Sequence, residues 1–425
     1  MRNLRIPFLF SAIALVLVNS LMAAAAGQHG GGHSSPAASL LPACQGAALP
    51  APDCGRTPAA AFDGQGRLWL VFSQNGHLYL TYSADRGASF AAPMVVNRVP
   101  ETISDDGENR PKLLLGDAGQ VFLSWTVKTP GKYAGAVRFA RSLDGGRHFD
   151  DPVTVNDDHA PISHRFDAMA RDSRGRLYIL WLDKRDLAAA KRNGSDYAGA
   201  AVYYAVSDDD GASFTANRKL VDHSCECCRI AVDIDDDDRL VALWRHVYPV
   251  NLRDHAIARV RADSTTLSGE PVRATDDGWI VDGCPHHGPD LSLSKADGQA
   301  GKAHITWFTR GTKHRGLMYG RFDLDQGQLE LQQSIDEAPA ASRPQVLATN
   351  GRVWRAWKAF DGSSTRLMAA DSTDEGETWS AARVIAQTAA ASDHPDLIAW
   401  HDEVFLSWHT QAEGYRLLPI TGATP

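Results

Sequence analysis

The sequence predicts an all-β fold, a seven-bladed β-propeller in a single domain. One phrase occurs seven times: a turn residue, then alternating apolar residues, then an aromatic residue that closes a strand. Such period-2 segments, repeated roughly every 50 residues, are typical of propeller blades, because each four-stranded blade buries its faces only against its neighbours. The seven copies span residues 66–72, 119–125, 175–181, 238–244, 301–307, 351–357 and 402–408.

The N-terminal region reads as an export signal followed by a leader. Arg2 and Arg5 precede an apolar run over 6–22 and three alanines at 24–26, which is the pattern of a cleaved secretory signal; an uncleaved anchor is the alternative. Residues 27–52 are rich in Gly, Ala, Ser and Pro, which indicates a flexible leader. We therefore expect a signal peptide at 1–26, a leader at 27–52, a propeller domain at 53–425, and a periplasmic or secreted protein.

Composition narrows the classes of partner. The chain has 425 residues, of which 44% are hydrophobic, so it can bury a large core. Its formal net charge of -8 and the lack of a Lys/Arg-rich run argue against nucleic acid. No other apolar segment is long enough to cross a bilayer, so we expect no membrane span after signal cleavage. No segment indicates a protein partner.

Seven cationic or imidazole side chains recur near the start of each blade's first strand. Since first strands line the channel of a propeller, these side chains should form a ring at one mouth of that channel. They are Arg56, Arg110, Arg165, Arg229, His287, Arg343 and His394. Arg110, Arg165, Arg229 and Arg343 are the candidates for binding a small anionic ligand.

Four of the six cysteines lie against this ring, in two adjacent blades. Cys225, Cys227 and Cys228 run directly into Arg229, and Cys284-Pro-His286-His287 opens the next blade. Thiolates and imidazoles suit copper or zinc and suit calcium or magnesium poorly, so these six residues are candidate metal ligands, with copper first and zinc second. In a strand Cys225 and Cys227 would face one way and Cys228 the other. His164, His223 and His394 are further candidates.

Disulfide bonding is the alternative for the same cysteines. Cys44 and Cys54 are close enough in the leader to pair with each other. In an oxidising compartment Cys284 could bridge to Cys225, Cys227 or Cys228 and join two blades, leaving His286 and His287 as polar lining. A redox-switching pair is a third reading of this segment.

A second motif, S-x-D-x-G-x-x-[FW], occurs in four hairpins, at 83–90, 142–149, 207–214 and 372–379. It describes a turn in which the Asp accepts backbone N–H groups, Gly takes a positive φ and the aromatic residue packs inward. With four copies, the sequence resembles the sialidase-like, Asp-box (BNR-repeat) β-propeller superfamily over nearly all of its mature length. That resemblance makes a six-bladed propeller the alternative fold, although we count seven repeats, and the last, at about 392–420, offers three strands that a leader strand would complete.

The resemblance also implies a chemistry that needs an arginine triad, a Tyr nucleophile with a Glu base, and an acidic residue. Arginines are available at the channel mouth. Tyr415 could be proposed as the nucleophile, Glu226 as its base and Asp105 or Asp106 as the acid, but no motif supports that choice. Whether the protein is an enzyme is therefore left open.

Two further segments have simple readings. The acidic run at 233–238 coincides with a first-to-second-strand turn, and we expect a solvated turn rather than a calcium loop. The insertion at 183–199 should form a short helical flap over one face.

Three functions follow from these observations. The leading hypothesis is an exported metal-binding propeller, with copper as the metal, that binds or sequesters the ion or does redox chemistry. The first alternative is a sialidase-like glycoside hydrolase in which the channel-mouth arginines clamp a carboxylate sugar. The second is a non-catalytic scaffold with structural disulfides.

Overall fold

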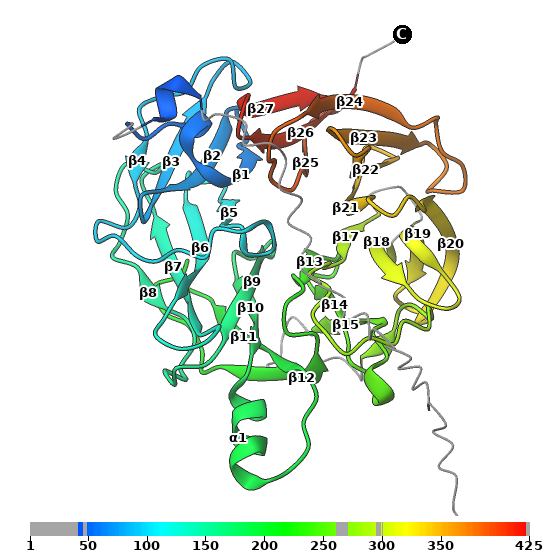
Figure 1. Cartoon of the computed structure of the whole chain (residues 1–425). Helices are drawn as coiled ribbons and strands as arrows, with labels where there is room; N and C mark the ends of the chain where they lie inside the picture. The colour runs from blue at the N-terminus through cyan, green and yellow to red at the C-terminus, as the bar shows by residue number, and fades with distance from the viewer. Residues whose placement is uncertain (1–40, 46–48, 261–270, 295–298, 300, 422–425) are drawn as a thin grey trace, which may run out of the picture. The chain divides into compact units, whose positions relative to one another are not determined.

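The computed structural model describes residues 41–45, 49–260, 271–294, 299 and 301–421. The expected signal peptide at 1–26 and most of the expected leader lie outside the described residues. The strands and helices described belong to one compact unit, Ser34–Pro425. Within its described part, seven separate antiparallel sheets succeed one another along the chain (Figure 1).

The first three blades each contain four strands in chain order from the inside out. Blade 1 contains β1 (Arg56–Phe62), β2 (Leu68–Gln74), β3 (His77–Ser83) and β4 (Met94–Val95). Blade 2 contains β5 (Lys112–Leu115), β6 (Val121–Lys128), β7 (Gly135–Ser142) and β8 (Val153–Thr154). Blade 3 contains β9 (His164–Arg171), β10 (Leu177–Asp183), β11 (Ala200–Ser207) and β12 (Arg218–Ser224).

The next four blades repeat the pattern, and the last is one strand short. Blade 4 contains β13 (Ala231–Ile234), β14 (Leu240–Arg245), β15 (His255–Val260) and β16 (Val272–Arg273). Blade 5 contains β17 (Asp290–Leu293), β18 (Lys302–Arg310), β19 (Arg315–Asp323) and β20 (Gln328–Asp336). Blade 6 contains β21 (Ser342–Thr349), β22 (Arg352–Phe360), β23 (Thr365–Ser372) and β24 (Arg383–Thr388). Blade 7 contains β25 (Asp396–Trp400), β26 (Glu403–Thr410) and β27 (Gly414–Pro419).

The first strands of consecutive blades contact one another around a ring. β1 contacts β5, β5 contacts β9, and the series continues to β25, which contacts β1 and closes the circle. The seven-bladed prediction is therefore confirmed, and the six-bladed alternative is wrong. Figure 1 shows the blades running from blue at β1 to red at β27, where the last blade returns to the first.

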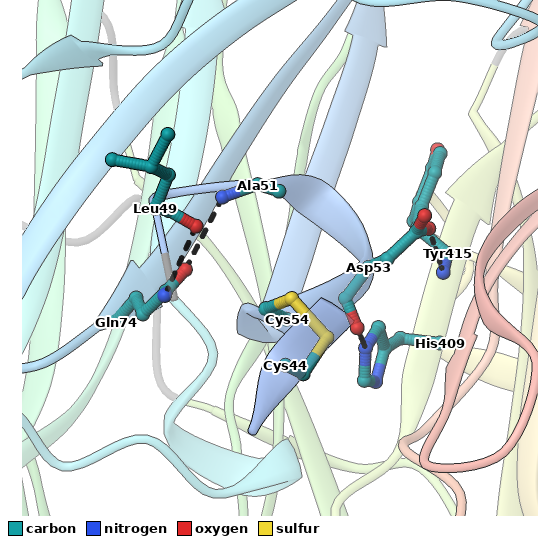
Figure 2. Close-up of a disulfide and its surroundings, with 8 residues drawn as sticks. All are labelled: Cys44, Leu49, Ala51, Asp53, Cys54, Gln74, His409 and Tyr415. Atoms are coloured by element: carbon teal, nitrogen blue, oxygen red, sulfur yellow. Dashed lines mark hydrogen bonds between the residues drawn. A yellow bond between two sulfur atoms is a disulfide. The ribbon is translucent and has the colours of Figure 1, made fainter. Parts of the chain in front are cut away.

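The closure at blade 7 differs from the expectation. Among the described residues no leader strand joins its sheet, which keeps three strands. Two 3-10 turns, η1 (Pro42–Cys44) and η2 (Pro52–Cys54), lie there instead, joined by the Cys44–Cys54 disulfide (Figure 2). The Asp53 side chain accepts the Tyr415 backbone N–H at 3.0 Å, and its carbonyl oxygen lies 3.0 Å from His409 Nε2. The disulfide that we expected between Cys44 and Cys54 is thus present, and the bonds of Asp53 hold η2 against β26 and β27.

The closing aromatic residues form the packing between blades. Trp125, Trp181, Trp244, Trp307 and Trp408 are among the largest fully buried side chains. An indole needs a partner for its N–H when buried, and carboxylates supply it: Trp125 donates to Glu101, Trp307 to Asp277, and Trp357 to Asp336. The repeated phrase therefore encodes both the strand and the contact between blades.

The four S-x-D-x-G hairpins share one hydrogen-bond pattern. In the copy after β23, Asp374 Oδ1 accepts the Ser372 hydroxyl at 2.7 Å and the Thr378 N–H at 2.9 Å, and Ser372 Oγ accepts the Gly376 N–H at 2.9 Å. The equivalent bonds form around Asp85, Asp144 and Asp209. These carboxylates are engaged in their own turns.

Two other segments are now located. Within the acidic run, Asp235 Oδ1 accepts the Asp237 and Arg239 backbone N–H groups, which makes the run a turn between β13 and β14.

The insertion after β10 contains α1 (Arg185–Asn193), which packs against β11 and in Figure 1 extends outward beside β12. Within the described residues, no helix is long and apolar enough to span a membrane.

Candidate metal centre

Three cysteine thiols converge at the junction of blades 3 and 4. The sulfur of Cys225 lies 3.4 Å from that of Cys228 and 3.9 Å from that of Cys227. All three side chains are buried, and their sulfurs lie within 4.8 Å of one another. In the part of the chain that the structure describes, this is the one group of three or more Cys, His, Asp or Glu side chains whose ligand atoms are this close. We call it the three-thiol cluster.

The convergence arises because the segment is a turn and not a strand. Strand β12 ends at Ser224, and residues 226–228 form a bend before β13. The expected strand alternation, which would separate Cys228 from the other two, is therefore wrong. The Cys225 N–H donates to the Arg245 carbonyl at 2.8 Å, so the start of the turn is fixed to β14.

Cys284 is the fourth thiol near this place, and it is exposed. It lies in the connection between β16 and β17, and its thiol interacts with that of Cys227. All four cysteines are free in the structure, whose one disulfide is Cys44–Cys54. Cys284 is not part of the group of sulfurs that lie within 4.8 Å of one another.

The electrostatic surroundings distinguish the three buried thiols. Hydrogen bonds from Cys227 and Cys228, with the charges of Arg245 and Arg253, hold the pKa of Cys225 well below its usual value. Burial raises the pKa of Cys228 to about 11. The same hydrogen bonding raises the pKa of Cys227. The cluster therefore favours a thiolate on Cys225 stabilised by two neighbouring thiols.

The predicted histidine ligands lie apart from the three-thiol cluster. The His287 ring stacks on Phe308 with centroids 4.2 Å apart, and its buried Nδ1 has no hydrogen-bond partner. Burial also holds the pKa of His287 well below its usual value, so the ring is neutral. His286 is exposed, and its carbonyl oxygen accepts a hydrogen bond from Arg343.

The three further histidine candidates each contact residues other than the three cysteines. His164 Nδ1 lies 2.9 Å from the buried carboxylate of Asp183. His223 packs on Tyr197, with ring centroids 4.7 Å apart. His394 is half-buried, and its Nδ1 lies 3.9 Å from Glu108. None of the histidines described belongs to the three-thiol group.

A buried carboxylate that sequence analysis missed organises the channel mouth. Glu108, on η3 (Gly107–Asn109) before β5, has a side chain only 4% exposed. Its carboxylate accepts the Arg229 N–H at 3.0 Å and the Gly288 N–H at 3.2 Å. It also pairs with Arg343 Nη1 at 2.5 Å and with Arg229 Nη1 at 3.3 Å. The only feature of the sequence that could have pointed to Glu108 is its position two residues before Arg110. The other repeats have no acidic residue at the equivalent position.

The remaining channel-mouth arginines also have acidic partners. Arg110 Nη1 lies 3.2 Å from Asp396, Arg165 Nη2 lies 3.7 Å from Asp106, and Arg56 Nη1 lies 3.4 Å from Asp105. Arg110 and Arg165 are largely buried, whereas Arg56 is exposed. The cationic ring is therefore neutralised by carboxylates of the same chain.

The residues considered for a glycosidase mechanism are engaged elsewhere. The Tyr415 hydroxyl lies 3.1 Å from Ser407 Oγ, and burial raises its pKa. Glu226, the residue between Cys225 and Cys227, forms an ion pair with Lys184. The Tyr415–Glu226 pair that a nucleophile and its base require is therefore not formed here.

Comparison with known proteins concerns the fold. No protein-family model and no curated protein matches the sequence. An ulvan lyase of polysaccharide lyase family PL25 matches with a TM-score of 0.52 at 12% identity, over 86% of this chain and 93% of the lyase. The same lyase bound to -[GlcA(1-4)Rha3S]- gives a TM-score of 0.51 with the same identity and coverage. A Hadza microbial sialidase matches with a TM-score of 0.48 at 12% identity, over 87% of this chain and 74% of the sialidase. The lyase structures are similar to this chain in fold, and the family of the chain is not assigned by them.

Proposed function

We propose that this protein is an exported β-propeller that binds a thiophilic metal ion, copper(I) in preference to zinc, at Cys225, Cys227 and Cys228. The observation that carries the proposal is the three-thiol cluster: three buried sulfurs within 4.8 Å of one another. Soft thiolates are the ligands that copper(I) and zinc prefer. Its role is to bind and hold the ion.

The charges around the cluster support a metal bound by thiolates. A copper(I) ion with three thiolate ligands carries a net negative charge, which is costly to bury without compensation. Arg245 and Arg253 act on Cys225, Arg165 interacts with Cys227, and Arg343 interacts with Cys228. Two of the arginines that the sequence suggested for an anionic ligand, Arg165 and Arg343, are thus among those that act on the thiols.

The number of sulfurs favours copper(I) over zinc. Structural zinc sites are almost always four-coordinate and tetrahedral. The cluster offers three sulfurs, and a zinc ion would need Cys284 or another donor to complete its set. Copper(I) needs no fourth ligand.

Metal titration tests the proposal. Reduced, metal-free protein is titrated anaerobically with copper(I) and separately with zinc, against a chromophoric chelator. We expect one tightly bound copper(I) per chain, and loss of that binding in a Cys225→Ser/Cys228→Ser variant. A Cys44→Ser/Cys54→Ser variant removes two sulfurs elsewhere and should retain the binding. Unchanged stoichiometry without Cys225 and Cys228 would overturn the assignment.

Export is a separate part of the proposal. The pattern of residues 1–26 and the Cys44–Cys54 disulfide support it, since disulfides persist in oxidising compartments. Cell fractionation of the full-length chain tests it. The expected product is a processed chain outside the cytoplasm with Cys44 and Cys54 oxidised; a full-length chain in the cytoplasm would contradict export.

An acidic saccharide is the second candidate ligand. Arg110, Arg165, Arg229 and Arg343 gather at the channel mouth, and a lyase of similar fold was solved with a glucuronic-acid-containing saccharide. The carboxylates paired with these arginines would have to be displaced. Turnover of sialosides or acidic polysaccharides, lost in Arg110→Ala or Arg343→Ala and unaffected by Cys225→Ser, would favour this function. A chain that binds neither metal nor saccharide would be a scaffold.

A further inference from the structure

We infer that the channel mouth contains a carboxylate-binding site and that Glu108 occupies this site as an internal ligand. The loop that carries Glu108, residues 104–109, then acts as a plug, because a ligand carboxylate can enter only when the loop withdraws. The site and its internal occupant do not depend on the proposed metal binding. Entry of a saccharide carboxylate rests on the second candidate ligand proposed above.

The Glu108 carboxylate is surrounded by hydrogen-bond donors. Its Oε2 accepts the backbone N–H groups of Arg229 at 3.0 Å and of Gly288 at 3.2 Å. Its Oε1 accepts Nη1 of Arg343 at 2.5 Å and Nη1 of Arg229 at 3.3 Å. A carboxylate offers about four acceptor positions, so these four donors from blades 4, 5 and 6 match one planar anion.

The two arginines are also held by bonds that do not involve Glu108. Arg343 Nη1 donates to the His286 carbonyl, and Arg229 Nη2 donates to the Pro344 carbonyl at 3.3 Å. Both arginine side chains are largely buried. Without Glu108 their charges would be left unpaired in a buried place, which is costly. An emptied site should therefore take up an anion from solution.

The loop 104–109 has a partner in each of the other six blades. One partner per blade, from blade 1 and then from blades 3 to 7, is Arg56, Arg165, Arg229, Gly288, Arg343 and His394. Asp105 pairs with the first of these, Ser104 accepts a hydrogen bond from the second, and Glu108 meets the other four. A loop with partners on every side of the ring lies across the channel axis.

The loop is joined to the ring by side chains. In the described part of the chain, the one backbone-to-backbone hydrogen bond of residues 105–109 is internal, from the Asn109 N–H to the Asp106 carbonyl at 2.9 Å. No sheet is therefore broken when these residues move away from the mouth.

A glycine lets the loop approach blade 7. A Cβ atom on Gly107 would lie 2.4 Å from His394 Nδ1, closer than real Cβ contacts. A side chain at position 107 would therefore push the loop off the ring while leaving Glu108 and its donors in the chain. Position 107 thus provides a way to open the site without removing a charge.

Exchange of one carboxylate for another conserves the hydrogen bonds of the site. The ligand carboxylate takes the four donors, and the Glu108 carboxylate is hydrated. Binding to the parent chain is weakened by the fraction of chains in which the loop has withdrawn. The parent chain should therefore bind carboxylates weakly, and variants with an empty or displaced plug should bind them better.

Acetate tests the site, because Glu108→Ala removes a methylene and a carboxylate, which are the atoms of acetate. Acetate should raise the melting temperature of Glu108→Ala and bind it at least about tenfold more tightly than it binds the parent chain in calorimetric titration. Acetamide, which has a similar shape and no charge, should bind more weakly than acetate. Glu403→Ala, which removes the exposed carboxylate partner of Arg86, is the control and should gain nothing from acetate.

Gly107→Ala is a second variant, used because Glu108→Ala can fail to fold. It should also bind acetate more tightly than the parent chain does. Gly64→Ala is its matched control, since a Cβ there has no heavy atom within 4 Å. Circular dichroism checks that each variant folds.

Glucuronate, titrated into the same variants, distinguishes a saccharide carboxylate from a small free one. Binding of both ligands to the two variants supports the site and the saccharide candidate together. If acetate binds and glucuronate does not, the site stands and the saccharide candidate fails. If the folded variants bind acetate no better than the parent chain, the site is wrong. Equal binding of glucuronate to the parent chain and to Glu108→Ala would also overturn the proposal, because Glu108 would then not occupy the site.

Discussion

Gly288 lies so close to Arg229 that a Cβ atom on residue 288 would stand 2.6 Å from the Arg229 amide nitrogen and 2.7 Å from its carbonyl oxygen. Both residues donate their backbone N–H groups to the Glu108 carboxylate. The two cysteine-containing segments therefore meet backbone to backbone, with one carboxylate from blade 2 bonded to both. A side chain at position 288 would separate them.

The first prediction tests this contact. Gly288→Ala should lower the free energy of unfolding by about 2 kcal/mol, because the added methyl group must displace backbone atoms. It should also weaken metal binding, since the turn after β12 moves with Arg229. Gly283→Ala is the matched control: its Cβ would meet only Val281 Cγ2, at 3.9 Å. Denaturant unfolding and the copper(I) titration, run on both variants, check the difference.

Glu108 provides the second prediction. Glu108→Ala removes the partner of two largely buried arginines, and leaving buried charge unpaired should cost about 3 kcal/mol of unfolding free energy. Glu108→Gln keeps an acceptor for the backbone N–H groups and should cost less. Arg56→Ala, which breaks an ion pair whose arginine is 68% exposed, is the control and should cost under about 1 kcal/mol. Equal losses in Glu108→Ala and Arg56→Ala would contradict the role assigned to Glu108.

A third prediction concerns pH and Asp290. Burial raises the pKa of Asp290 to about 7, from an ordinary value of 3.8. The folded state therefore holds this proton more tightly than the unfolded state, and the resulting stabilisation is complete below pH ~4 and is lost as the pH rises towards 7. Asp290→Asn retains an oxygen to accept the Val346 N–H, which the carboxylate now accepts at 2.8 Å. The variant should gain stability relative to the parent chain between pH 4 and pH 7.

The control is Asp361, a carboxyl group whose pKa is lowered and not raised, so its effect on stability changes with pH in the opposite direction. Bonds from the Ser364 and Ser363 N–H groups hold the pKa of Asp361 below its usual value. Its stabilisation is present above pH ~4 and is lost as the pH falls below ~4, so Asp361→Asn should lose stability relative to the parent chain as the pH rises to ~4 and change little from pH 4 to 7. Urea unfolding from pH ~2 to pH ~7 measures both variants. An Asp290→Asn difference that does not change with pH would show that Asp290 titrates normally.

The fourth prediction tests the Lys184–Glu226 ion pair. Lys184 precedes α1, and Glu226 lies inside the turn that carries the three-thiol cluster. Lys184→Met should loosen that turn and speed alkylation of the buried thiols by about threefold, as expected for a partly exposed ion pair of ~0.7 kcal/mol. Lys191→Met, an exposed substitution on α1, is the control and should leave the rate unchanged. Timed alkylation with mass spectrometry distinguishes Cys284, which is exposed in every variant, from the three buried thiols.

The repeated pattern by itself determined the architecture. Seven copies of a period-2 phrase ending in an aromatic residue define seven sheets, because a blade has no other way to bury both faces and because the closing indole packs between neighbours. The short separation of Cys44 and Cys54 likewise identified their disulfide. These features depend on local sequence, so they can be predicted without knowledge of the tertiary structure.

The tertiary structure decided the site. In a strand, Cys225, Cys227 and Cys228 would be divided between two faces. Because the chain bends after β12, the three sulfurs instead lie within 4.8 Å of one another. The arginine ring could be predicted from the position of each arginine within its repeat. That Glu108 neutralises it could not, because the bonds of Glu108 to Arg229, Gly288 and Arg343 join residues 121, 180 and 235 positions apart. No local pattern encodes such pairings. They exist because closing the propeller brings one irregular loop of blade 2 against residues just before or within the first strands of blades 4, 5 and 6.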